Sequence, residues 1–249
     1  MDHRAEEINI TGTVAPLRNV MLLNTLIKRV QNRDWDLPGL ACFFGPSGYG
    51  KTMAATWNAQ QTRAYWVEMK STWSRRKFPE MILKSMGITP RGNIGDMVEQ
   101  IGEQLGKSRR PLLIDEADLI AKDSMIGIVR DIYETSQGSV ILIGEEDLPQ
   151  KLRKWERIHN RMLDWTPAQP ADLREVGLLA RLRCPSLTIQ EEVQKLVLER
   201  SHARARRIVV NLRQIAEYAL AQDKTDITMS DAPKIKFFSG DAPSPRRDV

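Results

Sequence analysis

The chain has 249 residues, of which 41% are hydrophobic and 28% are charged. This composition is typical of a folded domain and excludes wholesale disorder. Lysine and arginine number 37 against 32 aspartate and glutamate residues, and the net charge of +5 permits an anionic partner without requiring one. No apolar run has the length of a membrane span or a signal-peptide core, so we expect a cytoplasmic protein without a membrane partner. The two cysteines, Cys42 and Cys184, indicate neither a disulfide framework nor a metal site.

Short apolar segments alternate with amphipathic ones in the first two thirds of the chain. The predicted strands cover 40–44, 64–69, 111–114 and 139–143. The predicted helices cover 17–30, 51–61, 78–86, 94–105 and 124–136. This alternation predicts an α/β fold with a central, mostly parallel sheet flanked by helices.

The pattern changes at about residue 172, where we expect the strands to stop. Three helical patterns follow, at about 172–181, 189–203 and 211–222. The end of the chain is rich in proline and charge, which is typical of disorder. The expected organisation is an N-terminal arm (1–15), an α/β core (16–170), a helical lid (171–238) and a disordered tail (239–249).

A glycine-rich sequence lies between the first predicted strand and the following helix. It reads Gly45, Pro46, Ser47, Gly48, Tyr49, Gly50, Lys51 and Thr52, and it matches G-x-x-x-x-G-K-[ST]. Such a loop lets backbone N–H groups converge on phosphate oxygens at a helix N-terminus. We expect Lys51 to reach the β and γ phosphates of a nucleotide and Thr52 to bind Mg²⁺. The alternative is a purely structural glycine turn.

Two adjacent acids end the third predicted strand. The sequence Leu-Leu-Ile-Asp-Glu places Asp115 and Glu116 where open α/β sheets bind their ligands. We expect Asp115 to hold Mg²⁺ through water and Glu116 to act as general base on the attacking water, which indicates a hydrolase. The alternative is an acid pair that faces solvent. Asp118 is expected to be a solvated or loop-capping acid.

A basic segment follows the second predicted strand. Cations and hydroxyls suit contact with a phosphate backbone, and an aromatic residue lies among them. The candidate DNA-binding residues are Lys70, Thr72, Trp73, Arg75, Arg76 and Lys77. We expect this segment to contact a nucleic-acid backbone with little sequence preference, against the alternative of a solvated loop. A second basic cluster, His202 with Arg204, Arg206 and Arg207, is more typical of a solvated face or an oligomer contact.

Together, the glycine-rich loop, the Asp115–Glu116 pair and the lid resemble the AAA+ ATPases. The stretches 66–74 and 143–148 are similar to the transposition ATPases, the group of phage Mu transposition protein B, TnsC, TniB and IstB. The resemblance covers roughly residues 10–230. It implies a P-loop NTPase that uses ATP and Mg²⁺, forms a helical homo-oligomer on duplex DNA, delivers target DNA to a transposase, and works in the cytoplasm of a bacterial or phage-infected cell.

The resemblance also implies further site residues. Arg157 and Arg161 match the arginine that AAA+ proteins supply to a neighbouring subunit's γ-phosphate. Arg213 resembles the second sensor arginine, which contacts nucleotide from a helix start in the lid. The sensor position at the end of the fourth strand falls on Gly144 or Glu145, where the family usually has Asn, Ser or Thr.

Two other functions fit the same motifs. A helicase loader of the DnaC type would share the ATPase core but engage a replicative helicase. An ATP switch would hydrolyse slowly and only time an interaction. Stimulation of a transposase separates the first alternative from the leading interpretation, and the turnover rate separates the second.

Overall fold

The computed structural model describes residues 17–121 and 125–240. They divide into two compact units. The larger unit comprises Asn19–Ser47 and Lys51–Gln169, and the smaller comprises residues 17–18, 48–50 and 170–240. The predicted N-terminal arm and residues 241–249 of the predicted tail lie outside the described residues. Every helix in the described ranges is too short or too polar to cross a lipid bilayer.

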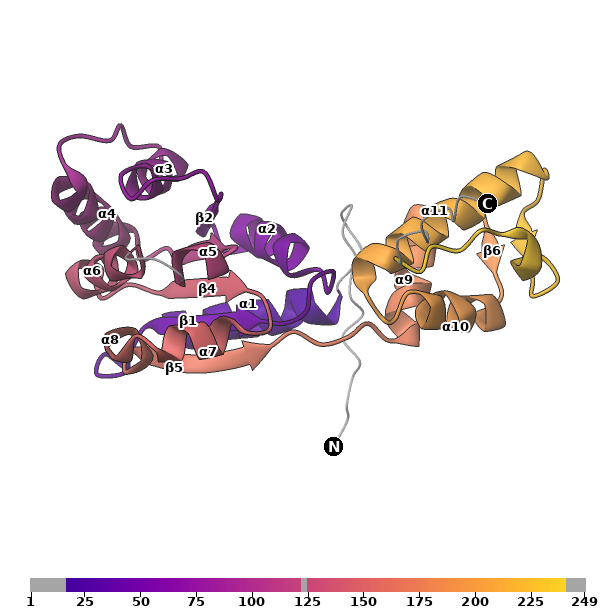
Figure 1. Ribbon diagram of the computed structural model, residues 1–249, viewed down its shortest axis with the longest axis horizontal. Helices are drawn as coiled ribbons and strands as arrows, with labels where there is room; N and C mark the ends of the chain where they lie inside the picture. The colour runs from indigo at the N-terminus through magenta and orange to yellow at the C-terminus, as the bar shows by residue number, and fades with distance from the viewer. Residues whose placement is uncertain (1–16, 122–124, 241–249) are drawn as a thin grey trace, which may run out of the picture. The chain divides into compact units, whose positions relative to one another are not determined.

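A parallel sheet of five strands forms the centre of the larger unit (Figure 1). The strands lie in the order β2-β3-β4-β1-β5. Their bounds are β1 Leu40–Phe44, β2 Tyr65–Glu68, β3 Leu112–Asp115, β4 Val140–Gly144 and β5 Met162–Pro167. The central strands β3 and β4 are fully buried, as expected for continuous apolar segments covered on both faces. The predicted α/β class with a parallel sheet is confirmed.

The edge strand β5 is absent from the sequence prediction, which contained four strands. Residues 162–167 pair in parallel with β1, with a register shift between Leu40 and Ala41. Five of the six residues of β5 are only half-buried, and the sixth is exposed. A strand of this kind needs neither a continuous apolar run nor a strict alternation, so it leaves little pattern in the sequence.

The helices of the larger unit cover the sheet and each other. α2 packs on β2, β3 and β4, whereas α4 packs on α3 and α6. α4 begins with a capping box between Asn93 and Asp96, which satisfies free N–H groups of its first turn. The short helices α5, α7 and α8 are additions to the predicted set. The bounds are α1 Arg18–Gln31, α2 Lys51–Gln61, α3 Lys77–Ser85, α4 Ile94–Ser108, α5 Asp118–Ala121, α6 Ile126–Ser136, α7 Leu148–Arg153 and α8 Glu156–His159.

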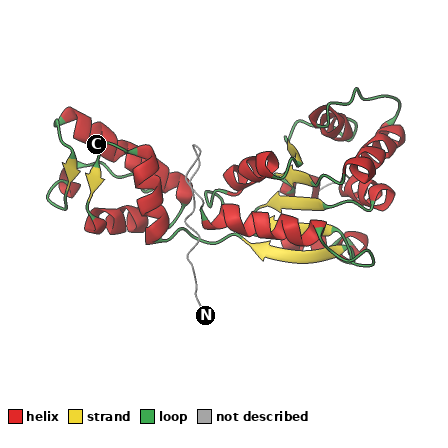
Figure 2. Cartoon of the chain, turned by 180° about the vertical axis from the view of Figure 1, so that it is seen from behind, coloured by secondary structure: helices red, strands yellow, loops and turns green. Residues whose placement is uncertain are grey.

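The smaller unit is mainly helical (Figure 2). It has its own apolar core. Its helices are α9 Leu173–Arg183, α10 Glu191–Arg200, α11 Ala205–Ala221 and the 3₁₀ turn η1 Ala232–Lys234. The buried core includes Val176, Val193, Ile208, Leu212 and Ile215. Cys184 is buried in this core and Cys42 in β1, and both are free thiols, as expected.

Two expectations for the smaller unit are wrong. Strands do not stop at residue 172, because β6 (Thr188–Ile189) and β7 (Asp226–Ile227) form a short parallel pair. The last long helix begins at Ala205 rather than at 211. Its first turn contains charged residues, and the arginines at 204, 206 and 207 interrupt the apolar pattern that would predict a helix there. The first buried apolar residue of the helix is Ile208.

Ala203 lies just before α11 in a strained backbone conformation. Its φ is +53°, in the left-handed region that favours glycine over residues with a Cβ atom. The conformation is fixed by hydrogen bonds on both sides, since Ala203 N–H donates to Leu198 O at 3.1 Å and Ala203 O accepts from Ala171 N–H at 2.9 Å.

Replacing Ala203 by Gly should stabilise the protein by about 1 kcal/mol, because glycine removes the steric cost of the left-handed conformation. Denaturant unfolding followed by circular dichroism measures the change. The matched control is Ala216→Gly inside α11, which should destabilise by about the same amount. A loss of stability in both variants would contradict the assignment of strain at Ala203.

Candidate functional site

The glycine-rich loop, residues 45–52, connects β1 to α2. Gly48 and Gly50 have φ values of +86° and +84°. A side chain at either position would be strained. α2 begins at Lys51, so the loop leads directly into a helix N-terminus, with its free N–H groups and the positive end of its dipole. The backbone therefore has the form of a phosphate-binding turn.

The Lys51 side chain folds back over this loop. Its Nζ donates to the carbonyl oxygens of Gly45 and Pro46 at 2.6 and 3.0 Å. Burial lowers the pKa of Lys51, and nearby carboxylates, of which Asp115 has the largest effect, oppose that shift. The ammonium group thus lies among the acids that end β3, as the paired motifs predict.

Asp115 is a buried carboxylate with an unused oxygen. The residue ends β3 and is 1% exposed. Its Oδ1 accepts the N–H of Glu116 at 2.9 Å, whereas Oδ2 has no hydrogen-bond partner within the described residues. Burial raises the pKa of Asp115 to about 6, despite the opposing effects of the Glu116 N–H and the Thr52 hydroxyl. A buried charge in this state needs a cation or a donor to offset its desolvation.

The surroundings of Asp115 fit Mg²⁺. Where this ion binds with nucleotide phosphates, the protein contributes only one or two oxygen ligands. Thr52 is the second residue of α2, and its hydroxyl lies near enough to lower the pKa of Asp115. The described residues contain no group of three His, Cys, Asp or Glu side chains that could hold a metal alone. Thr52 and Asp115 would therefore hold the ion together with phosphate oxygens.

Glu116 differs from Asp115 in exposure and in backbone conformation. Its φ is +54°, which is strained for a residue with a side chain, and it is exposed immediately after the buried Asp115. Strained conformations of this kind concentrate at functional sites. The two adjacent acids are therefore suited to different tasks, one to hold a cation and one to meet water.

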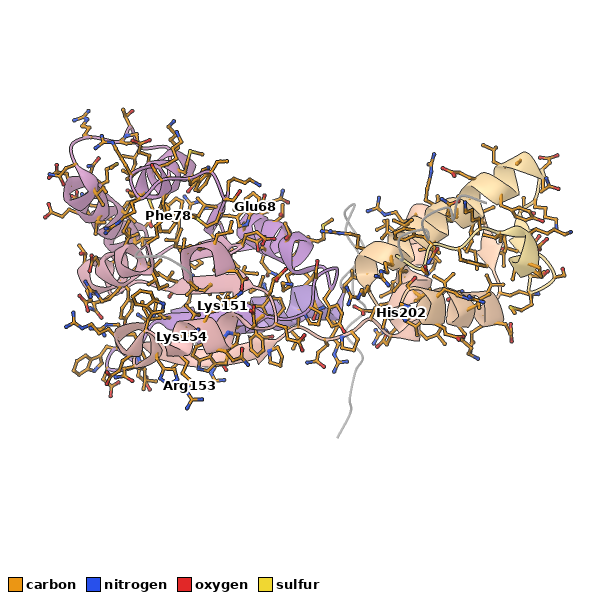
Figure 3. The ribbon with its side chains drawn as sticks, viewed as in Figure 1. Glu68, Phe78, Lys151, Arg153, Lys154 and His202 are labelled. Atoms are coloured by element: carbon orange, nitrogen blue, oxygen red, sulfur yellow. The ribbon has the colours of Figure 1, made fainter. Side chains whose placement is uncertain are left out.

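Asp118 is buried and not solvated. It is 6% exposed, and its two oxygens accept hydrogen bonds from Glu145 N–H at 2.6 Å and from Lys151 Nζ at 2.8 Å. Lys151 lies on α7 with Arg153, and Lys154 follows as the C-cap of this helix (Figure 3). The solvated alternative for Asp118 is wrong, whereas its loop-capping role is confirmed.

Asp118 also accounts for the glycine at the end of β4. A Cβ atom built on Gly144 would lie 2.2 Å from Asp118 Oδ2. The carboxylate of Asp118 therefore fills the space that an Asn, Ser or Thr side chain would occupy at the predicted sensor position. The other candidate, Glu145, is bound to Asp118 through its backbone N–H.

Glu68 is a site residue that the sequence prediction missed. It ends β2 (Figure 3) and is the register partner of Asp115 on β3. Register partners on neighbouring parallel strands point to the same face, and the Glu68 charge contributes to raising the pKa of Asp115. Lys70 Nζ lies 2.7 Å from the Glu68 carboxylate. The sequence does show an acid at the end of the second strand. Placing that acid beside Asp115, however, requires the knowledge that β2 and β3 are neighbours in the sheet.

The basic segment after β2 places its predicted DNA-binding residues in different environments. Thr72 and Arg75 are exposed. Trp73 is half-buried and packs against the core of the larger unit. Arg76 and Lys77 lie 3.1 and 3.7 Å from Glu80, and Lys70 is paired with Glu68 as described above. The segment is therefore less basic than its sequence suggests.

The two candidate trans-acting arginines also differ. Arg161 lies in the turn after α8, where it pairs with Glu134 and donates to Arg157 O at 2.6 Å. Arg157 is exposed on α8, and its guanidinium has no hydrogen bond or ion pair to any described residue. Of the two, Arg157 is available to an external phosphate.

Arg213 lies in the middle of α11 and not at a helix start. Its Nε donates to Glu217 at 2.7 Å, and its side chain is 76% exposed. It lines a cavity of about 310 Å³ in the smaller unit, together with Cys184 and Leu220. The basic cluster at 202–207 instead occupies the start of the same helix.

Residues 34–152 match a family model described as AAA domain. This segment contains β1 to β4, the glycine-rich loop and the Asp115–Glu116 pair. A search of curated proteins found no match.

Several solved structures have a fold similar to that of this chain. The Aeropyrum pernix ORC2 protein in its ADP form has a TM-score of 0.68 and 12% identity, over 85% of this chain and 66% of that one. The Aeropyrum pernix ORC1 protein in complex with DNA has a TM-score of 0.63 and 17% identity, over 90% of this chain and 65% of that one. The Thermotoga maritima RuvB Holliday junction branch migration motor has a TM-score of 0.60 and 16% identity, over 87% of this chain and 67% of that one.

The chain spans just under two thirds of the length of the two Aeropyrum proteins. At these identities the likeness concerns the fold. Together with the AAA domain match, it shows that the chain has the fold of an AAA-type P-loop ATPase.

Replacing Asp115 by Asn should change how the stability of the nucleotide-free protein depends on pH. Folding raises the pKa of this group from 3.8 to about 6, so between these values the folded state binds more protons than the unfolded state. Stability should therefore fall as the pH rises through this window, by up to roughly 3 kcal/mol. The variant should lose this dependence and be the more stable protein at pH 7.

Thermal unfolding between about pH 3 and pH 7 measures the effect. Asp147→Asn is the control, because hydrogen bonding to Lys151 lowers the pKa of Asp147 and the expected effect has the opposite sign. Parallel profiles for the wild type and the Asp115 variant would contradict the desolvated state of this carboxylate.

Proposed function

We propose that this chain is an ATP-hydrolysing, DNA-binding AAA+ protein that forms helical filaments on duplex DNA and delivers target DNA to a transposase. The observation that carries the proposal is the buried carboxylate of Asp115, whose Oδ2 has no hydrogen-bond partner among the described residues. This carboxylate lies close to Lys51 and Thr52 and needs a cation to offset its desolvation. Such a carboxylate next to a phosphate-binding turn is suited to a nucleotide bound with Mg²⁺.

The glycine-rich loop and its neighbours would bind the nucleotide through its phosphates. Lys51 exchanges its contacts with Gly45 O and Pro46 O for the β and γ phosphate oxygens, and the loop N–H groups surround the β phosphate. Thr52 and Asp115 would hold Mg²⁺, which neutralises charge on the phosphates when bound. Binding also relieves the cost of the buried carboxylate, since it gains a cation.

Glu116 is the proposed general base. Its carboxylate accepts a proton from the attacking water as the oxygen forms a bond to the γ-phosphorus. The bond between this phosphorus and the β,γ-bridging oxygen breaks, and ADP and phosphate are the products. The exposed position of Glu116, held by its backbone conformation, suits contact with water, whereas Asp115 is too buried for this role.

DNA binding and assembly rest on other support. The basic segment after β2 offers cations and hydroxyls to phosphates, and a similar fold has been seen in complex with DNA. The transposase role rests on the resemblance of stretches 66–74 and 143–148 to the transposition ATPases. Stimulation of DNA strand transfer by the purified protein would separate this role from that of a helicase loader.

Arg157 is the proposed trans-acting arginine in the assembly. Its guanidinium is exposed on α8 and has no partner among the described residues, so it is available to a neighbouring subunit, where its fixed charge and forked donors suit a γ-phosphate. Arg161 would instead position α8 through its hydrogen bond to Arg157 O and its ion pair with Glu134.

Glu116→Gln should bind ATP with near-normal affinity but lose turnover by roughly 100-fold or more, because the base is removed and the phosphate contacts are kept. It should also retain DNA longer in ATP than the wild type. Lys51→Ala is the comparison variant and should lose nucleotide binding. Phosphate release and calorimetric titration measure the two effects, and unchanged turnover in Glu116→Gln would reject this residue as the base.

Arg157→Ala should bind ATP yet lose hydrolysis in the assembled state by roughly 100-fold or more, as expected for an arginine that stabilises transition-state charge. Mixing it with Glu116→Gln should restore activity, since the second subunit supplies Arg157 to an intact site. Arg161→Ala is the control and should keep most of the turnover. If no mixture recovers activity, Arg157 does not act in trans.

A further inference from the structure

The cations of the basic segment after β2 are not equally available. Lys70 pairs with Glu68 at 2.7 Å, and Arg76 and Lys77 share Glu80. Within the described residues, Arg75 is exposed and makes no hydrogen bond or ion pair through its side chain. Of the four predicted DNA-binding cations, it is the one without an internal counter-charge.

A second loop lies beside this segment. Arg76 Nη2 donates to the carbonyl oxygen of Gly92 at 2.9 Å, which joins the segment after β2 to the α3–α4 loop. The segment after β2 precedes α3 and the α3–α4 loop follows it, and Phe78 marks the first turn of this helix (Figure 3). Arg91 precedes Gly92 in this loop and is exposed, and its guanidinium has no hydrogen bond or ion pair to any described residue.

The backbone around Arg91 is held firmly. Its carbonyl oxygen accepts from Gln100 Nε2 at 2.9 Å, and Gly92 has a φ of +78°. Asn93 then caps α4, and the Asp96 carboxylate accepts a hydrogen bond from Asn93 N–H at 2.6 Å. The start of α4 is therefore satisfied by its own side chains, so an external anion would meet the Arg91 guanidinium and not the helix end.

We propose that Arg91 and Arg75 form one phosphate-binding surface on two loops joined by Arg76, and that this surface binds the backbone of duplex DNA. The inference rests on the proposed DNA-binding function and names the residues that carry it. Guanidinium groups without internal partners can neutralise phosphates without first breaking an ion pair. The exposed hydroxyl of Thr72 on the first loop adds a donor to phosphate oxygens.

The prediction is that Arg91→Ala weakens duplex binding several-fold and reduces the slope of log K against log salt by about 0.9, the loss of one phosphate contact. Fluorescence anisotropy over a salt series, with a slowly hydrolysed ATP analogue, gives both values. Arg91→Lys should retain most of the slope, because it keeps the charge. Arg75→Ala should behave like Arg91→Ala, and the double variant should lose about twice as much slope.

Lys84→Ala is the matched control. It removes one exposed cation from the last turn of α3, outside the two loops that Arg76 joins, and should leave the slope unchanged. Equal ATP binding by all variants shows that they are folded. Wild-type affinity and slope in Arg91→Ala would overturn the inference while the proposed DNA binding stands. If the wild-type protein does not bind duplex DNA, both the inference and the proposed DNA binding are overturned. The same titration with duplex RNA tests the choice of nucleic acid: if Arg91→Ala weakens binding to RNA but not to DNA, the choice of DNA is overturned.

Discussion

The desolvated carboxylate of Asp115 is the constraint on which the nucleotide site depends. Its Oδ2 lacks a partner in the described structure, and the surrounding acids make its charge still harder to accommodate. A protein of marginal stability keeps such a group where it serves a ligand. The glycine-rich loop leads into Lys51 and Thr52, which lie close to this carboxylate and would bind the phosphates and the cation of a nucleotide. Stability given up in the free protein is regained on binding, which links nucleotide occupancy to the state of this part of the fold.

Internal ion pairs decide which of the many cations can act outside the chain. Arg161 is committed to Glu134, and Lys151 to Asp118 and Asp147. The same reasoning separates Arg157 from Arg161, and Arg75 and Arg91 from their paired neighbours. Exposed ion pairs contribute little stability, so their main effect here is on local charge. The net charge of +5 therefore does not measure how many cations are available, because many of them are already paired with acids of the same chain.

Much of the site was predictable because its signals are local. The loop at 45–52 and the Asp115–Glu116 pair are continuous motifs next to apolar strands, and the structure places them as expected. The contributions of Glu68 and Asp118 depend on strand order and on the packing of α5 against β4, which spacing along the chain does not encode. The pair between Arg161 and Glu134 joins residues that are far apart in sequence. The edge strand β5 left no periodic pattern for a different reason, because its residues are only half-buried or exposed and need no alternation of apolar and polar side chains.

The central claim is that nucleotide state controls assembly on DNA, and electron microscopy tests it most directly. The purified protein would be imaged with duplex DNA in a slowly hydrolysed ATP analogue and in ADP. Regular helical filaments around DNA are expected with the analogue, and their loss is expected in ADP. Absence of a DNA-bound assembly in both nucleotides would contradict the central claim, and filaments of equal abundance in both would contradict control by the nucleotide.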